Sequence, residues 1–285
     1  MESRTCIRRR AFGPPPRVLF RNRTRAIVGW PVKRANLAGW LLVAVVTALA
    51  EAAVRLFELG DSVAAPSATF RALVEGLTSG TLSGEIGTTL ESYVEGLALA
   101  IGAGVVLGVV IGSSRILLSA VSVVIEFLRP IPAVAMIPLA ILFLGLGVPM
   151  RRFVIAYAAL WPILVNTIYG VRGSDRLLHD VARTSGVTRG GRLVRVALPA
   201  ALPSIATGIR VSASIALLVG VTAEFVTGTG GIGSYMQRQQ LAFQLPELYA
   251  AVVLVGCLGY AINVGLRLAQ RRAIFWVGED RAGAR

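Results

Sequence analysis

Long apolar stretches recur along this chain and are separated by shorter, more polar connections. A helix needs roughly 20 apolar residues to cross the hydrocarbon core of a bilayer. Five stretches meet or nearly meet that length, and polar residues weaken a sixth. The pattern predicts an all-α polytopic membrane protein with about six transmembrane helices, over residues 37–57, 90–111, 121–144, 153–171, 205–226 and 248–268.

The polar connection between the first two predicted spans carries its own periodicity. Phe70, Leu73, Val74 and Leu77 recur at the spacing of one helical face, within a stretch that otherwise holds several acidic residues. A short helix with one apolar face lies stably at a membrane surface. We therefore predict an amphipathic helix on the outer side of the membrane.

Small residues and prolines shape the second and third predicted spans. Gly104, Gly108 and Gly112 lie four residues apart, so a second helix can approach that face closely. In the third span, residues 129–132 read Arg-Pro-Ile-Pro. Proline lacks the N–H donor of a helix and clashes with the preceding turn, so we expect a kink there.

Composition agrees with a membrane protein. Of the 285 residues, 55% are hydrophobic and 15% charged, which is too apolar for a water-soluble fold of this size. The net charge of +14 could suggest a nucleic-acid partner, but the basic residues follow the predicted topology. With the N-terminus inside, 22 Lys and Arg lie on the cytoplasmic side and five outside. We predict a multi-pass bacterial plasma (inner) membrane protein that contacts lipid, has a cytoplasmic N-terminus and binds no nucleic acid.

The residues that usually carry chemistry are scarce. The chain has one histidine, His179, and two cysteines, Cys6 and Cys257, so neither a metal site nor a disulfide framework is expected. Its single lysine, Lys33, does not sit in a Walker A loop. Residues 228–233 spell Gly-x-Gly-x-x-Gly, but without a preceding strand we interpret them as an outer turn. No catalytic residue is predicted, and the protein is not expected to be an enzyme.

The same features divide the chain. Residues 1–36 are predicted to be a basic, largely disordered cytoplasmic tail, and residues 37–85 the first span with the outer amphipathic segment. Residues 86–270 are predicted to form the core transmembrane domain, with a cytoplasmic loop over 173–203, and residues 271–285 a second cytoplasmic tail.

That loop is unusually ordered for a connection. Residues 175–185 place apolar and charged side chains on opposite helical faces, and Gly186 supplies a turn. A second helix starts at Leu193, and Pro199 and Pro203 lead back into the membrane. A folded helical hairpin held between two spans is suited to dock into a partner and transmit a push.

The loop resembles the permease family of ATP-binding-cassette importers. That family's motif is Glu-Ala-Ala, three residues, Gly, nine residues, an aliphatic residue, one residue and often Leu-Pro. Here Asp and Val replace the Glu and the first Ala, while the spacing is the same throughout. The resemblance assigns coupling to the ATPase to the following residues: Leu178, Asp180, Val181, Ala182, Gly186, Val196, Leu198 and Pro199.

The resemblance extends from Gly87 to Trp276 and is strongest to permeases for sulfonates, taurine, nitrate or bicarbonate. It is carried by residues 129–132, by Gly145-Leu-Gly147 and by Ala223-Glu224-Phe225, among others. It implies the type I importer permease fold and a homodimer served by two ATPase subunits and an extracytoplasmic binding protein. This chain itself is then expected to hold no cofactor, with ATP and Mg on the partner ATPase.

Charged residues inside the predicted spans are candidates for the substrate pathway. These are Arg129, Arg210 and Glu224. Glu126 lies one turn from Arg129, so a salt-linked pair or snorkelling to the interface is the simpler explanation of that arginine. We expect transport of a small solute, such as an aliphatic sulfonate, taurine or nitrate; riboflavin or a thiamine precursor remains open. A stand-alone secondary transporter or channel is the alternative, and a membrane enzyme a third option.

Overall fold

The computed structural model describes residues 37–57 and 63–273, and within them every regular element is helical. The chain divides into two compact units, Met1–Val46 and Thr47–Arg285. Most of both predicted tails lies outside the described residues. The elements are α1 (Leu37–Leu56), α2 (Pro66–Thr78), α3 (Thr81–Ser113), α4 (Arg115–Leu128), η2 (Ala133–Met136), α5 (Ile137–Leu144), α6 (Val148–Arg172), α7 (Arg176–Thr184), α8 (Arg189–Arg192), η3 (Leu193–Ala197), α9 (Leu198–Thr227), α10 (Ile232–Leu241) and α11 (Leu245–Ala273).

Five described helices are long and apolar enough to cross a membrane: α1, α3, α6, α9 and α11. They coincide with the first, second, fourth, fifth and sixth predicted spans, which confirms the all-α polytopic fold. Large apolar side chains on them and on α4 and α5 are open to the surroundings, for example Val106, Phe127 and Leu142. Surfaces of this kind require hydrocarbon as solvent.

The third predicted span differs from the expectation. It is a broken pair, α4 followed by η2 and α5, bent by 85°. Pro130 and Pro132 cannot donate backbone hydrogen bonds, and the last regular bond before them runs from Arg129 N to Ile125 O at 2.9 Å. The predicted kink is therefore a complete break, and the pair counts as a sixth span only if both arms are taken together.

A helix, α2, is present where the sequence predicts an amphipathic helix after the first span. It begins at Pro66, whose fixed φ suits the first helical turn. It packs against α11 and joins α3 through Gly80, which has a φ of +83°. Phe70 on its surface is exposed.

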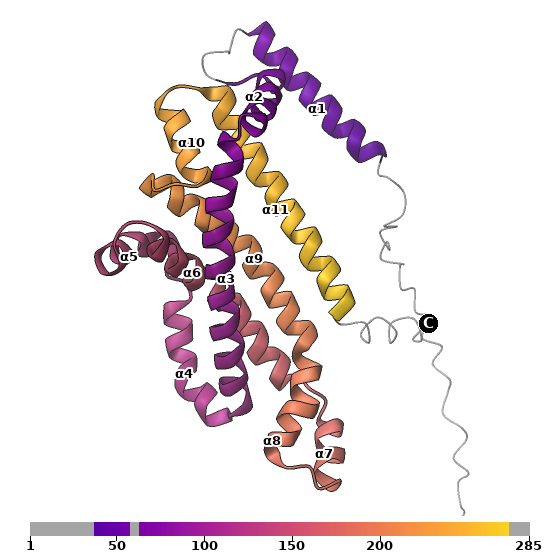
Figure 1. The fold of residues 1–285 in the computed structure, drawn as a ribbon. Coiled ribbons are helices and arrows are strands. Elements are labelled where there is room, and N and C mark those ends of the chain that lie inside the picture. Colours follow the sequence, from indigo (N-terminus) through magenta and orange to yellow (C-terminus); the bar gives the residue numbers. More distant parts are fainter. Residues whose placement is uncertain (1–36, 58–62, 274–285) are drawn as a thin grey trace, which may run out of the picture. The chain divides into compact units, whose positions relative to one another are not determined.

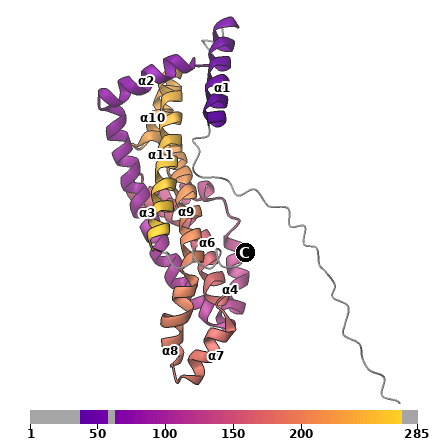
Figure 2. The same ribbon diagram turned by 90° about the vertical axis from the view of Figure 1, so that its right-hand side faces the viewer.

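The core of the second unit forms where α3, α6 and α9 meet (Figures 1 and 2). The glycine face predicted on the second span packs against α6. A Cβ atom at Gly108 would lie 2.5 Å from Thr167 Cβ, and one at Gly104 would lie 2.9 Å from Ile163 Cγ2. Only glycine allows this helix spacing. Figure 1 shows the α7–α8 loop at one end of these helices and α10 at the other.

Candidate functional site

Local hydrogen bonds shape the loop that carries the predicted coupling residues. Asp175 Oδ1 accepts a hydrogen bond from Leu177 N at 2.9 Å and caps the start of α7. Gly186 ends the helix with a φ of +76°, and its N donates to Arg183 O at 3.2 Å. Glycine occupies this left-handed conformation without strain. The predicted turn at Gly186 is therefore present.

Helix α7 turns an apolar face away from the protein. Leu177, Leu178 and Val181 are 66%, 51% and 55% exposed, and we call them the α7 apolar face. Val194 on η3 is exposed as well. Helix α7 lies outside the helices that are long and apolar enough to cross a membrane, at one end of the core in Figure 1, so lipid does not account for the exposure of its apolar face. An apolar surface open to water indicates a binding site for another protein.

The base of the loop is fixed firmly to the core. Ala197 is buried together with Val171, Ala201 and Ile205. Gly170 allows α6 to approach α9 so closely that a Cβ atom there would lie 3.0 Å from Ala201 Cβ. The chain runs from η3 into α9 without a break. A force on the loop is therefore passed directly to a membrane-spanning helix.

The eight predicted coupling residues fall into two groups. Leu178, Asp180 and Val181 are exposed on α7, where a partner can reach them. The other five lie in the last turn of α7, in the turn that follows it and in the connection to α9, and of these only Gly186 is exposed. They are Ala182, Gly186, Val196, Leu198 and Pro199. The structure thus separates an exposed surface from a connection to the core, which spacing alone did not distinguish.

The three predicted pathway residues do not come together. Arg210 and Glu224 lie on the same helix, α9, but 14 residues of helix separate them by about 21 Å along its axis. Arg129 follows α4, at the break before η2, and is exposed. Glu126 is also exposed and forms no ion pair with Arg129, so the salt-linked pair considered from the sequence is absent.

Glu224 belongs to a buried polar network near α10. Its side chain is 1% exposed. Glu224 Oε2 accepts hydrogen bonds from Thr89 Oγ1 at 2.9 Å and from Gly233 N at 3.1 Å. Thr89 Oγ1 in turn accepts from Ile232 N at 2.9 Å. These bonds tie α3, α9 and the start of α10 together.

Arg151, near the start of α6, completes this network. It is 1% exposed, and its Nη1 donates to Thr229 O at 2.7 Å and to Gly230 O at 2.9 Å. Its Nε donates to Ser92 Oγ at 3.1 Å. A buried guanidinium is stable only with such partners. Two of its acceptors lie in the turn 229–233 and the third, Ser92, lies on α3, all far from Arg151 along the chain, so no local pattern indicates its burial.

A peripheral pair extends the same network. Glu85 accepts a hydrogen bond from Gly231 N at 2.7 Å and forms an ion pair with Arg238 at 2.5 Å. Burial, with a smaller effect of Glu247, raises the pKa of the neighbouring Tyr235. We call Glu85, Thr89, Arg151, Glu224 and Arg238, with the backbone of the turn 229–233, the α10-end network. This network holds the turn 229–233 in place, and we assign its five side chains a structural role.

Comparison with known proteins gives several relatives. A putative ABC transporter permease protein of Methanocaldococcus jannaschii is 35% identical over 58% of this chain and 62% of its own length. The putative aliphatic sulfonates transport permease protein SsuC of Escherichia coli is 34% identical over 53% of this chain and 58% of its own length. The bicarbonate transport system permease protein CmpB of Synechococcus elongatus is 33% identical over 56% of this chain and 58% of its own length. The chain thus spans about three fifths of these relatives.

Solved structures agree on the fold. The inward-facing MetNI methionine ABC transporter matches with a TM-score of 0.58 and 20% identity, over 67% of this chain and 94% of the matched chain. At this identity the likeness shows the fold alone. Residues 100–275, more than half of the sequence, match a family model that includes the loop described above. The chain therefore belongs to the family described as binding-protein-dependent transport system inner membrane component.

Proposed function

We propose that the chain is the membrane-spanning permease subunit of an ATP-binding-cassette importer. In this proposal two copies form the translocation pathway and an extracytoplasmic binding protein delivers the solute. ATP and Mg are held by two separate ATPase subunits, and this chain carries out no covalent chemistry. The work of ATP binding reaches the pathway through the α7–α8 loop, which extends into the cytoplasm when the N-terminus lies inside.

The α7 apolar face is the observation that carries this proposal. It pairs a surface suited to a protein partner with a base buried against α6 and α9. A secondary transporter working alone has no need for such a surface. Fully burying one aliphatic side chain contributes roughly 1.5–3 kcal/mol, so two of these residues can account for much of the docking energy.

For the substrate we propose a small anion, such as an aliphatic sulfonate, taurine, nitrate or bicarbonate. The names of SsuC and CmpB support this class and do not single out one member. Among the charged residues, Arg129 is the best placed to meet the solute, because it is exposed at a break in the helices. Arg210 remains a second candidate. We propose that Glu224 maintains the pathway indirectly, by holding the turn before α10.

The decisive experiment replaces Leu178 and Val181 together by Asp. In the purified complex in lipid, the double variant should bind the ATPase roughly ten- to hundredfold more weakly and lose hydrolysis stimulated by the loaded binding protein. Thr188→Asp is the matched control. It adds charge to the same loop, but Asp can still accept the hydrogen bond from Gly191 N that Thr188 Oγ1 accepts at 3.2 Å.

Two results would count against the proposal. If the double variant assembles and hydrolyses ATP like the control, α7 is not the docking helix. If the wild-type chain in proteoliposomes moves solute without an ATPase, the secondary-transporter alternative replaces the importer. Uptake of labelled taurine, nitrate and bicarbonate by the intact complex then ranks the candidate anions.

A further inference from the structure

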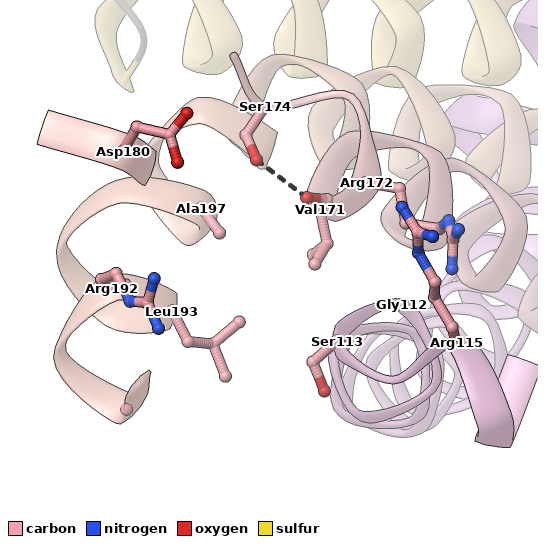
Figure 3. A pocket seen from close by; sticks show the side chains of 11 residues that line it. Gly112, Ser113, Arg115, Val171, Arg172, Ser174, Asp180, Arg192, Leu193 and Ala197 are labelled. Carbon is pink, nitrogen blue, oxygen red and sulfur yellow. Dashed lines mark hydrogen bonds between the residues drawn. The ribbon is translucent and has the colours of Figure 1, made fainter. Parts of the chain in front are cut away.

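A large pocket lies where the α7–α8 loop meets the ends of the core helices (Figure 3). Its volume is about 880 Å³. One part of its wall comes from the end of α3, the start of α4 and the end of α6, and the other from the loop, with α8 and η3. The pocket therefore spans the joint between the rigid core and the proposed docking loop.

The lining is strongly basic. Arg115, Arg172 and Arg192 all contribute to it, against a single carboxylate, that of Asp180. The ion pairs among the described residues involve other arginines, so none of these three guanidinium groups forms an ion pair with a described carboxylate. The Nε atom of Arg192 is buried and has no hydrogen-bond partner in the structure. A buried, unpaired charged donor is costly unless a ligand accepts from it.

The three arginines come from both sides of the joint. In Figure 3, Arg115 and Arg172 lie on the wall formed by the core helices, and Arg192 and Asp180 lie on the opposite wall. Arg115 is the first residue of α4 and Arg172 the last of α6, so their backbones are fixed by the core. An anion between the walls would contact the core and the loop at once.

We propose that this pocket binds a phosphate-bearing anion, which links the docking loop to the core helices. The planar guanidinium group donates paired hydrogen bonds that match phosphate oxygens, and several arginines around one cavity are suited to a doubly charged or diester phosphate. The same chemistry is offered by an anionic phospholipid headgroup of the cytoplasmic leaflet and by soluble phosphate. The proposal does not depend on which solute is transported, so it stands or fails independently of the substrate class.

The test measures amide hydrogen exchange of residues 173–197 in the full chain, reconstituted in phosphatidylcholine nanodiscs. One arm adds inorganic phosphate, and the other replaces part of the phosphatidylcholine by phosphatidylglycerol. Binding should slow exchange in the loop roughly tenfold, because charge-assisted bonds then join it to the core. Protection by phosphate alone identifies a soluble ligand, and protection by phosphatidylglycerol alone identifies a lipid headgroup.

Variants distinguish anion binding in the pocket from a general effect of positive charge on the surface. Arg115→Gln combined with Arg172→Gln should abolish the protection, whereas Arg115→Lys combined with Arg172→Lys, which keeps both charges, should retain part of it. Arg267→Gln is the matched control, because this exposed arginine near the end of α11 lies outside the pocket. Exchange elsewhere in the chain verifies that each variant is folded. The proposal is overturned if neither anion protects the loop, or if Arg267→Gln removes the protection as fully as the pocket variants.

Discussion

The two ends of the helical core are built on opposite principles. At one end, the α10-end network buries Arg151 and Glu224 and supplies them with hydrogen-bond partners from the same chain. At the other end, the loop exposes the α7 apolar face, and the three arginines of the pocket form no ion pair among the described residues. Polar groups are satisfied where the fold must hold its shape, and surfaces are left open where a partner or ligand is proposed.

This contrast explains how one chain can be both rigid and responsive. A network of buried hydrogen bonds resists deformation, since each unpaired group would cost free energy. The loop has few contacts of its own beyond its base, so its position can follow whatever binds it. Helices α6 and α9 connect the two ends, and a displacement of the loop is thus expected to act on a fixed opposite end.

The largest expected effect is at the closed end. Arg151→Met should lower the free energy of unfolding by about 3 kcal/mol or more, because the buried guanidinium group is lost and the partly buried Thr229 O and Gly230 O lose a charged donor. Thermal unfolding in detergent or nanodiscs measures it. Arg152→Met is the control: Arg152 pairs with partly exposed glutamates on α3, and its loss should cost under about 1 kcal/mol. Equal losses of unfolding free energy in the two variants would show that the buried network stabilises the protein no more than an exposed ion pair does.

An intermediate effect is expected in the helices that join the ends. Gly108→Ala should destabilise the protein by about 1–3 kcal/mol, because its Cβ would lie 2.5 Å from Thr167 Cβ and would push α3 from α6. A Cβ atom added at Gly102, on the same helix, would meet no atom within 4 Å beyond the backbone of its own helix. Gly102→Ala should therefore be neutral or slightly stabilising, owing to the higher helix propensity of alanine. If the two variants unfold at the same temperature, the close contact does not hold the core together.

The smallest effect on stability is expected at the open end. Leu178→Ser combined with Val181→Ser should change the free energy of unfolding by less than about 0.5 kcal/mol, because both side chains are more than half exposed. The same variant should still bind the ATPase more weakly than wild type. Calorimetry and co-purification of one preparation measure both quantities. A loss of stability as large as that of Arg151→Met would mean that the α7 apolar face packs within the chain and is not a docking surface.

The sequence predicted the features that depend on local pattern. Runs of apolar residues indicated five helices, because a helix that crosses the hydrocarbon core must be apolar. The spacing around Gly186 indicated the turn of the loop, because glycine is required there. The sequence did not predict the complete break over 129–132, since the mean hydropathy of a long segment stays high even where prolines interrupt the helix. Nor did it predict the burial of Arg151 or the bonding of Glu224, because their partners come from α3, from the glycine turn and from the start of α10, which only the tertiary fold brings together.

The distance along the chain between Arg151 and its acceptors has a consequence for biosynthesis. In the proposed orientation, the start of α6 with Arg151 must be translocated across the bilayer, against the usual retention of positive charge on the inside. Thr229 is made 78 residues later, which at 5–20 residues per second is a delay of roughly 4–16 s. During that interval Arg151 can bond to Ser92, which is made earlier, but not to its two carbonyl acceptors. The bonds that hold Arg151 in the folded protein are therefore completed only after the turn before α10 has been made.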